Sequence, residues 1–424
     1  MIALLFGLLV VLLVLGVPVA FALGLAAMAT IWQGDLMPLL IVPQESIRAI
    51  NSFPLLAIPF FILAGFLMQS GGISRRLVEF SNTLVGAMQG GLAIVAIVTS
   101  LFFAAISGSG TATAAAVGSI LIPAMIAKGY SRDYAAANQA ASGALGVVIP
   151  PSIPLILFGV AANVSIGDMF LAAIFPGILV AVCLCIYAYV YAGRHPHVSE
   201  ERSSLGDILR AGRKALLAIL MPIVVLGGIY GGIVTPTEAA VIAVVYSLVV
   251  GVVVYREIPI RQLPVVFRQS AVTSAVILVI IATAGLYGRI ILSLQVPAII
   301  SDWVIASVSS KIVFLIALNL LLLLTGMFIE AAAAILILTP ILLPIAISFG
   351  IDPVHFGVIV VVNLAMGMFT PPVGLNLFIV SQISGAGIAQ LSRAILPFVV
   401  IVFSAVLIVS FWPDLSLWLP SLSK

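Results

Sequence analysis

The feature that most constrains this chain is the extent of its apolar stretches beside its few charges. Asp, Glu, Lys and Arg make up 7% of the 424 residues, and 63% are hydrophobic, whereas soluble globular domains carry roughly 25% charged residues. A membrane-spanning helix needs about 20 apolar residues, and stretches of that length fill most of the sequence. These proportions exclude a soluble enzyme and a disordered chain. They predict an all-α polytopic membrane protein in a lipid bilayer.

Basic residues are unevenly distributed between the apolar blocks, which lie at 2–32, 53–70, 91–127, 134–163, 169–193, 215–233, 238–255, 271–296, 312–349, 354–385 and 394–412. One arrangement of these blocks across the membrane places most of the basic residues on a single side, which the positive-inside rule makes cytoplasmic. It requires 91–127 and 312–349 to be re-entrant hairpins of two half-helices. The basic residues on this face are Arg75, Arg76, Lys128, Arg132, Arg194, Arg202, Arg210, Arg213, Lys214, Arg256, Arg261, Arg268 and Arg393.

The chain repeats its Gly and Pro pattern at one fixed offset, the separation between Pro123 and Pro344, without a gap. Because these residue types fix backbone geometry, the same bends are predicted to recur. Five crossings separate the two copies, and an odd number turns the second copy upside down. Inverted repeats with broken helices are the architecture of secondary transporters. The matched positions are Pro123 and Pro344, Gly129 and Gly350, Gly146 and Gly367, Pro150-Pro151 and Pro371-Pro372, and Pro176 and Pro397.

The repeat divides the chain into six predicted parts. They are an N-terminal membrane segment at 1–52, a first repeat at 53–193, a cytoplasmic loop at 194–214, central linking helices at 215–270, a second, inverted repeat at 271–412 and a C-terminal tail at 413–424. The block at 2–32 has Val17-Pro18 in its middle. It is long for one helix and short for two, so the side of Met1 stays open.

Each repeat contains two irregular points, a hairpin tip and a Pro-Pro break. They lie at Ser107–Thr113 and Gly146–Ser152 in the first repeat, and at Thr325–Glu330 and Gly367–Gly374 in the second. A Pro-Pro pair opens a helix, and opened backbone must line a cavity or pack on protein. The freed carbonyls and nearby hydroxyls suit Na⁺, and half-helix N-termini suit an anion. One pair alone is also compatible with a structural kink; two at symmetric places favour a binding role.

Four motifs resemble the large membrane subunit of tripartite ATP-independent periplasmic (TRAP) transporters. They are I-S-G-S-G-T-A-T-A-A-A-V-G-S-I-L-I-P-A-M, I-P-P-S-I-P-L-I-L-F-G, T-P-T-E-A-A and G-M-F-T-P-P-V-G-L-N-L-F. The resemblance covers essentially the whole chain. It implies an elevator-type, Na⁺-driven importer of an organic acid in the bacterial inner membrane. It also implies a small four-helix membrane subunit and a periplasmic substrate-binding protein as partners. The tip also looks like that of divalent-anion/Na⁺ symporters, which have a related, ion-transporter-superfamily fold.

The resemblance further implies where ligands bind. It places one cation near Gly326, Gly367, Thr370 and Val373, and the offset between the repeats then gives Gly146, Ile149 and Ser152, with Ser107 and Gly108, as the symmetric site. Ile149 offers only a carbonyl where Thr370 adds a hydroxyl, so we expect unequal sites. The candidate substrate contacts are Ser109, Thr111, Asn376, Arg289 and Arg48.

Several charged residues lie in or beside apolar blocks. Glu238 follows Thr235-Pro-Thr at a predicted helix start, so helix capping and gating both fit it. Glu330 follows the second tip, where coupling and capping both fit. Arg289 lies in an otherwise uncharged apolar segment, and such a residue points to a partner or a site unless it snorkels to the interface. Arg48, expected in an outer-facing loop, is a second residue that can meet an acidic ligand.

Other functional classes fit the sequence less well. A stand-alone anion/Na⁺ symporter is the rival within the same class. An ion channel would show four-fold repetition, and an intramembrane protease would need a nucleophile–base pair or paired acids in the membrane. We therefore expect no enzyme activity, no cofactor other than Na⁺ as coupling ion, no transition metal and no nucleic-acid partner. Cys183 and Cys185 are expected to be ordinary buried thiols.

The basic asymmetry gives a topological prediction. Lys128, Arg210 and Arg261 should lie in the cytoplasm, and 163–168 and 294–302, which lack Lys and Arg, in the periplasm. Single cysteines at positions 210 and 297, labelled with a membrane-impermeant reagent in intact cells, should react only at 297. Labelling of both positions from one face would overturn the inverted topology.

Overall fold

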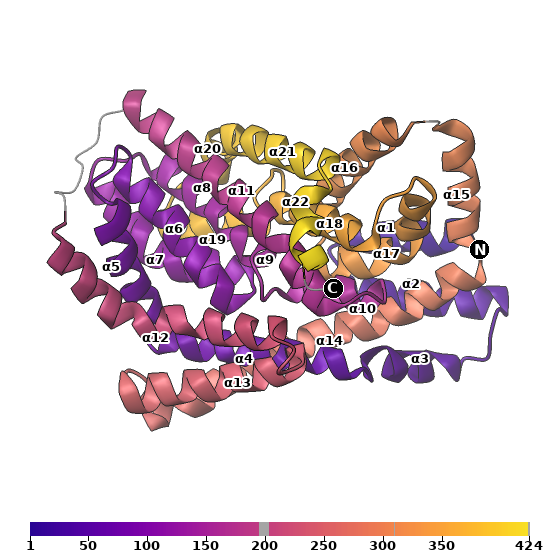
Figure 1. Ribbon diagram of the computed structural model, residues 1–424. Helices are drawn as coiled ribbons and strands as arrows, with labels where there is room; N and C mark the ends of the chain where they lie inside the picture. The colour runs from indigo at the N-terminus through magenta and orange to yellow at the C-terminus, as the bar shows by residue number, and fades with distance from the viewer. Residues whose placement is uncertain (195–202, 309, 423–424) are drawn as a thin grey trace.

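The computed structural model describes residues 1–194, 203–308 and 310–422, and their regular elements are all helices (Figure 1). Eight helices are long and apolar enough to cross a membrane, and up to 11 if each of three bent helix pairs counts as one span. The prediction of an all-α polytopic membrane protein is confirmed. Arg202, part of the loop predicted at 194–214 and the last two residues of the predicted tail lie outside the described residues.

The N-terminal block forms two helices, α1 (Ile2–Val14) and α2 (Val19–Gly34), which pack together. The chain reverses between them where Gly16 adopts a φ of 80° and Pro18 precedes α2. Glycine takes this conformation without steric cost, and proline supplies no N–H to continue a helix. The break therefore settles the open question of one helix or two.

Residues 41–50 form helix α3 (Ile41–Ile50), so the prediction that Arg48 lies in a loop was wrong. The helix packs along α14 (Leu263–Ser293) (Figure 1). Packing against a neighbouring helix stabilises a short helix that its own propensity leaves marginal. The sequence of the segment alone does not contain that contact.

A layer of scaffold helices occupies the lower part of Figure 1, and it consists of α3, α4 (Ala57–Ser70), α12 (Leu205–Tyr230), α13 (Pro236–Leu248) and α14. Helix α4 packs against both α13 and α14, and α5 (Ile73–Val85) packs against α12. The layer therefore joins the N-terminal segment to the central linking helices and to the start of the second repeat. The scaffold further includes η1 (Phe53–Leu56), α5 at the left of Figure 1, the π-helical end of α13 (Val249–Val254) and η3 (Ile260–Gln262). Helix α15 (Val296–Ser307) lies at the upper right of the figure, where it packs on α17 (Ala331–Ser348).

The two repeats follow the same order of helices. The first contains α6 (Gly91–Ser107), α7 (Gly110–Ala127), α8 (Arg132–Gly143), α9 (Leu145–Val148) and α10 (Ile153–Ala161). The second contains α16 (Lys311–Phe328), α17 (Ala331–Ser348), α18 (Pro353–Gly367) and α19 (Leu375–Ser384). Helices α8 and α9 of the first repeat together correspond to α18 of the second. The ends of α6 and α16, and the starts of α7 and α17, are separated by the same offset as the Gly and Pro matches. The predicted fold class, two inverted repeats with a re-entrant hairpin and a discontinuous helix in each, is confirmed.

The repeats differ after the breaks. In the first repeat α11 (Ile166–Arg194) is continuous through Pro176. In the second repeat the corresponding chain forms α20 (Ile388–Ala394) and α21 (Leu396–Phe411), and α20 is bent by 114° from α19. The final helix, α22 (Asp414–Leu422), packs on α11.

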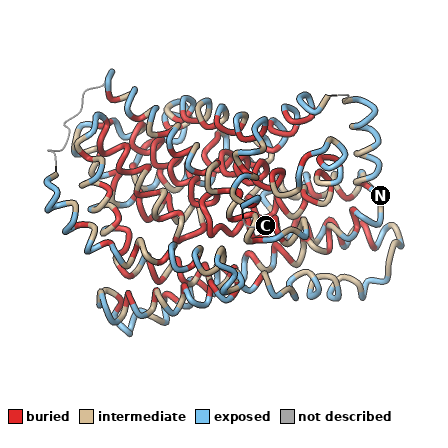
Figure 2. The backbone as a smooth tube through the Cα atoms, in the orientation of Figure 1, coloured by how far each residue is buried: buried red, intermediate tan, exposed pale blue. Residues whose placement is uncertain are grey.

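The repeats interlock rather than forming separate bodies. The second hairpin arm of each repeat packs against the half-helix that follows the break of the other, α7 against α19 and α17 against α10. The buried residues gather between these elements in Figure 2, and residues 134–159 and 355–370 are buried throughout. The first break is therefore enclosed by protein, as opened backbone in a membrane requires, whereas Pro372 in the second break is exposed.

Candidate functional site

The first hairpin tip rests directly on the first Pro-Pro break. Gly108 turns the chain between α6 and α7 with a φ of 59°. Its carbonyl accepts a hydrogen bond of 3.3 Å from the Ile153 amide, just beyond the break. A Cβ atom at Gly108 would lie 2.7 Å from the Pro151 carbonyl oxygen. The tip approaches the break so closely that only glycine fits there.

Hydroxyl and carbonyl oxygens gather at this contact. The Ser107 and Thr113 hydroxyl oxygens are 2.9 Å apart, and the Thr113 hydroxyl donates to the Ser109 carbonyl over 2.8 Å. A Cβ atom at Gly146 would overlap both Thr113 and the Ser109 carbonyl. Three of the residues predicted for the first cation site, Ser107, Gly108 and Gly146, are thus brought together.

Thr113 is the one member of this group that sequence reasoning missed. It lies at the end of the tip motif, one helical turn after Ser109, and that spacing was the available signal. The two other predicted ligands, Ile149 and Ser152, lie in the break itself, where the Ser152 hydroxyl bonds the Val147 carbonyl and accepts from the Leu155 amide.

The second site is built on a contact between two glycines. A Cβ atom at Gly326 would lie 3.2 Å from the Gly367 Cα atom, and one at Gly367 would overlap the Gly326 backbone. The Gly374 amide donates to the Met327 carbonyl over 3.4 Å, which ties the far end of the break to the same helix. Here the last turn of α16, rather than the tip itself, meets the break.

Thr370 is buried between these points. Its hydroxyl donates to the Met366 carbonyl over 2.7 Å, and its amide donates to the Gly367 carbonyl over 3.1 Å. Val373, the fourth predicted ligand, lies in the break between Thr370 and Gly374. Both predicted sites therefore combine a helix end with an opened segment and offer oxygen ligands without formal charge, which is the chemistry of Na⁺ sites in broken helices.

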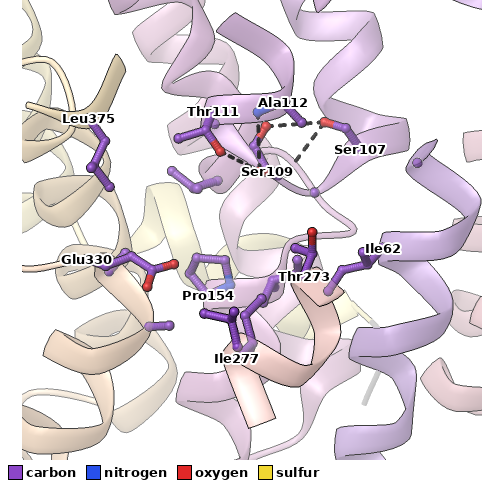
Figure 3. A pocket seen from close by; sticks show the side chains of 18 of the residues that line it. Ile62, Ser107, Ser109, Thr111, Ala112, Pro154, Thr273, Ile277, Glu330 and Leu375 are labelled. Atoms are coloured by element: carbon purple, nitrogen blue, oxygen red, sulfur yellow. Dashed lines mark hydrogen bonds between the residues drawn. The ribbon is translucent and has the colours of Figure 1, made fainter. Parts of the chain in front are cut away.

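A cavity of about 580 Å³ lies between the scaffold and both repeats (Figure 3). Helices α4 and α14 line it on one side. The first tip, the start of α10 and the start of α17 line it on the other. Of the predicted substrate contacts it includes Ser109 and Thr111. The cavity is of the size that small-molecule sites have.

Glu330 extends into this cavity, with its carboxylate directed toward Pro154 (Figure 3). It is the N-cap residue of α17, but its side chain makes no capping hydrogen bond. In the described part of the chain the carboxylate has no hydrogen-bond or ion-pair partner. Of the two readings left open by the sequence, helix capping is not what this side chain does here.

Glu238 behaves differently. It closes a capping box with Thr235, accepting hydrogen bonds of 2.8 Å from both the Thr235 amide and its hydroxyl. Such boxes fix the start of a helix. The structure therefore shows Glu238 capping helix α13, and the gating role stays a prediction.

The remaining predicted substrate contacts lie away from the tip cavity. Arg48 and Arg289 both line a second cavity of about 330 Å³ between α3, α14, α10 and α17. Arg48 pairs with Glu45 over 3.5 Å, whereas Arg289 has no ion pair among the described residues. Asn376 is buried and donates to the Ala140 carbonyl over 3.0 Å, joining α19 to α8.

A polytopic helical fold with paired hairpins, broken helices and a cavity between them and the scaffold is the architecture of a membrane transport protein. The chain matches the model of the tripartite ATP-independent periplasmic transporter DctM component over residues 6–415. It belongs to this family, and is a multi-pass protein of the bacterial inner membrane. The resemblance seen in its motifs is thereby confirmed.

Individual relatives agree with this assignment. The chain is 46% identical over 98% of its length to the isethionate TRAP transporter permease protein DctMQ of Oleidesulfovibrio alaskensis, of which it spans 65%. It is 41% identical to the C4-dicarboxylate TRAP transporter large permease protein DctM of Pseudomonas aeruginosa, over 91% of this chain and 92% of that one. The sialic acid permease SiaM of Vibrio cholerae is 36% identical over 96% of this chain and 95% of that one.

A solved structure shows the same fold. The YdaH transporter of Alcanivorax borkumensis superposes with a TM-score of 0.64 at 18% identity, covering 88% of this chain and 87% of that one. At this level of identity the likeness concerns the fold alone.

The glycine contact of the second site gives a prediction about stability. Gly367→Ala forces a methyl group into the Gly326 backbone, and overpacking of this kind costs roughly 1–3 kcal/mol. Thermal unfolding of the purified protein should shift to lower temperature by several degrees. Gly227→Ala is the matched control, since a Cβ atom there meets nothing within 4 Å in helix α12. Equal unfolding temperatures for both variants would contradict the close contact.

Proposed function

We propose that this chain is the permease subunit that carries a small organic acid across the inner membrane, driven by Na⁺ and by an elevator movement of the hairpin-bearing helices against the scaffold. One observation carries the proposal. A single cavity is bounded by the scaffold helices α4 and α14 on one side and by elements of both repeats on the other. A ligand in it touches both bodies that would have to move.

Na⁺ coupling follows from how the tips meet the breaks. A cation held by carbonyl and hydroxyl oxygens of a tip and a break ties the two segments together. Ser107, Ser109 and Gly108 line the cavity as well as approaching the first break. Cation binding would therefore order the surface that the substrate meets, which makes substrate affinity depend on Na⁺ by linkage.

An acidic substrate fits the first tip. Gly110, Thr111 and Ala112 open helix α7 and line the cavity. The N–H groups at a helix start lack partners within the helix and favour an anion. The relatives' named substrates, isethionate, C4-dicarboxylates and sialic acid, are all acids. We extend an organic-acid substrate, a small membrane subunit and a periplasmic binding protein to this chain on that basis.

The first test of this proposal concerns Na⁺. Thr370→Ala removes a hydroxyl oxygen from the second site, so half-maximal uptake into proteoliposomes should require about tenfold more Na⁺, as expected from the loss of roughly one polar contact. Thr283→Ala is a matched control, because the Thr283 hydroxyl also bonds the carbonyl four residues earlier but lies in α14, outside the site. Uptake that proceeds equally well with K⁺ or choline in place of Na⁺ would refute the coupling.

The second test concerns the partners. The purified chain should take up little substrate alone, and uptake should appear when the small membrane subunit and a substrate-loaded binding protein are added. Radiolabelled uptake with each component left out in turn measures this. Rapid uptake by the chain without any binding protein would favour the stand-alone anion/Na⁺ symporter.

A further inference from the structure

The cavity between the scaffold and the repeats has uncharged polar groups at the first tip and a carboxylate, Glu330, at the start of α17. At the first tip its polar lining consists of uncharged groups, including the hydroxyls of Ser107, Ser109 and Thr111. Among the described residues that line it, Glu330 is the single ionisable side chain. Figure 3 shows the hydroxyls of Ser107, Ser109 and Thr111 on one side of the cavity, the Thr273 hydroxyl on another, and the Glu330 carboxylate reaching in toward Pro154. The described residues of this lining include no Lys, Arg or His.

The Glu330 carboxylate has unused capacity to accept hydrogen bonds. It makes no cap for α17, and the described residues give it no donor. An ionised carboxylate can only accept, and its bonds to donors are worth more than those between neutral groups. A carboxylate held in this position therefore favours a ligand that brings its own donor.

The acid group of a substrate is bound more favourably at the start of α7 than beside Glu330. Like charges repel, and Glu330 disfavours a second carboxylate beside it. The start of α7 offers the backbone amides of Gly110 and Thr111, whereas the Ala112 amide donates to the Ser109 hydroxyl. The hydroxyls of Ser109 and Thr111 lie 3.2 Å from each other at the same place. The acid group of a bound substrate would thus face the first tip, and its other end would face Glu330.

We propose that Glu330 recognises a hydroxyl or ammonium group at the end of the substrate remote from its acid group. The substrate class is then a small hydroxy or amino organic acid rather than a plain dicarboxylate. This inference rests on the proposed function, since it names the substrate that the transport cavity selects. Isethionate, named for one relative, carries a hydroxyl opposite its sulfonate and has the required form.

Matched ligands test this directly. Ethanesulfonate, 2-hydroxyethanesulfonate and 2-aminoethanesulfonate share one acid group and differ only at the far end, as do propionate, 3-hydroxypropionate and 3-aminopropionate. Their equilibrium binding is measured to the full-length chain with its small membrane subunit in nanodiscs, in NaCl. In each series the hydroxy or amino compound should bind about ten- to a hundredfold more tightly than its parent, the range of a hydrogen bond to a charged group.

Two variants assign that preference to Glu330. Glu330→Ala should bind all members of a series within about threefold of one another, with affinity for the parent acids unchanged or improved. Glu330→Gln should lose the ammonium preference more than the hydroxyl preference, because its amide oxygen still accepts a hydrogen bond. Retained binding of the parent acids shows that the variants are folded. Asp207→Asn, which alters the capping box of α12 outside the cavity, should keep the full preference.

The outcomes separate the inference from the function on which it rests. Equal binding within each series by the unaltered protein, or a preference that survives Glu330→Ala, would overturn the donor-recognition role. A changed Na⁺ dependence with unchanged ligand preference would also overturn it and make Glu330 a coupling residue. Failure of all six acids and of succinate to bind the unaltered protein would overturn the proposed function, and this inference with it.

Discussion

Opened backbone inside a membrane must be covered by protein, and the rest of this structure depends on that requirement. Each Pro-Pro break frees carbonyl groups that lipid cannot satisfy. The repeats interlock, so that α7 packs on α19 and α17 packs on α10, and the first break is buried throughout while Pro372 of the second is exposed. The same arrangement brings tips and breaks to the border of a cavity on the scaffold. The helices that pack against the opened segments therefore also form the border of the cavity.

The two repeats share a backbone plan but differ in chemistry. The first tip supplies hydroxyl groups, with Ser107 and Thr113 in contact. The second meets its break through Gly326 and Gly367, and its hydroxyl comes from Thr370 in the break. A symmetric fold therefore gives two unequal candidate cation sites. The helices that follow also differ, since α11 is continuous and its counterpart is divided into α20 and α21.

Several of the charged side chains have an ion-pair partner or a capping role, and two that line the cavities do not. Arg75 and Arg76 both pair with Glu257, over 3.1 and 2.7 Å, and Glu238 caps a helix. Those residues have structural tasks at helix ends. Glu330 in the tip cavity and Arg289 in the second cavity have no ion-pair partner in the described chain. Arg289 is exposed, as an arginine that snorkels to the interface would be, and Glu330 is the residue for which we propose a ligand.

The sequence by itself determined the class and the plan. Apolar length required membrane helices, and the spacing of Gly and Pro located the repeat to the residue, because these types act on the backbone locally. It also named Ser107, Gly108 and Gly146, which the structure brings together. Tertiary structure decided the features that depend on neighbouring segments. It made α3 a helix and brought Thr113 to the first site. It also placed Arg48 and Arg289 in a separate cavity and directed the Glu330 side chain into the tip cavity, where it does not cap α17. Side-chain direction and packing partners follow from contacts between segments far apart in the chain, and local spacing carries no record of them.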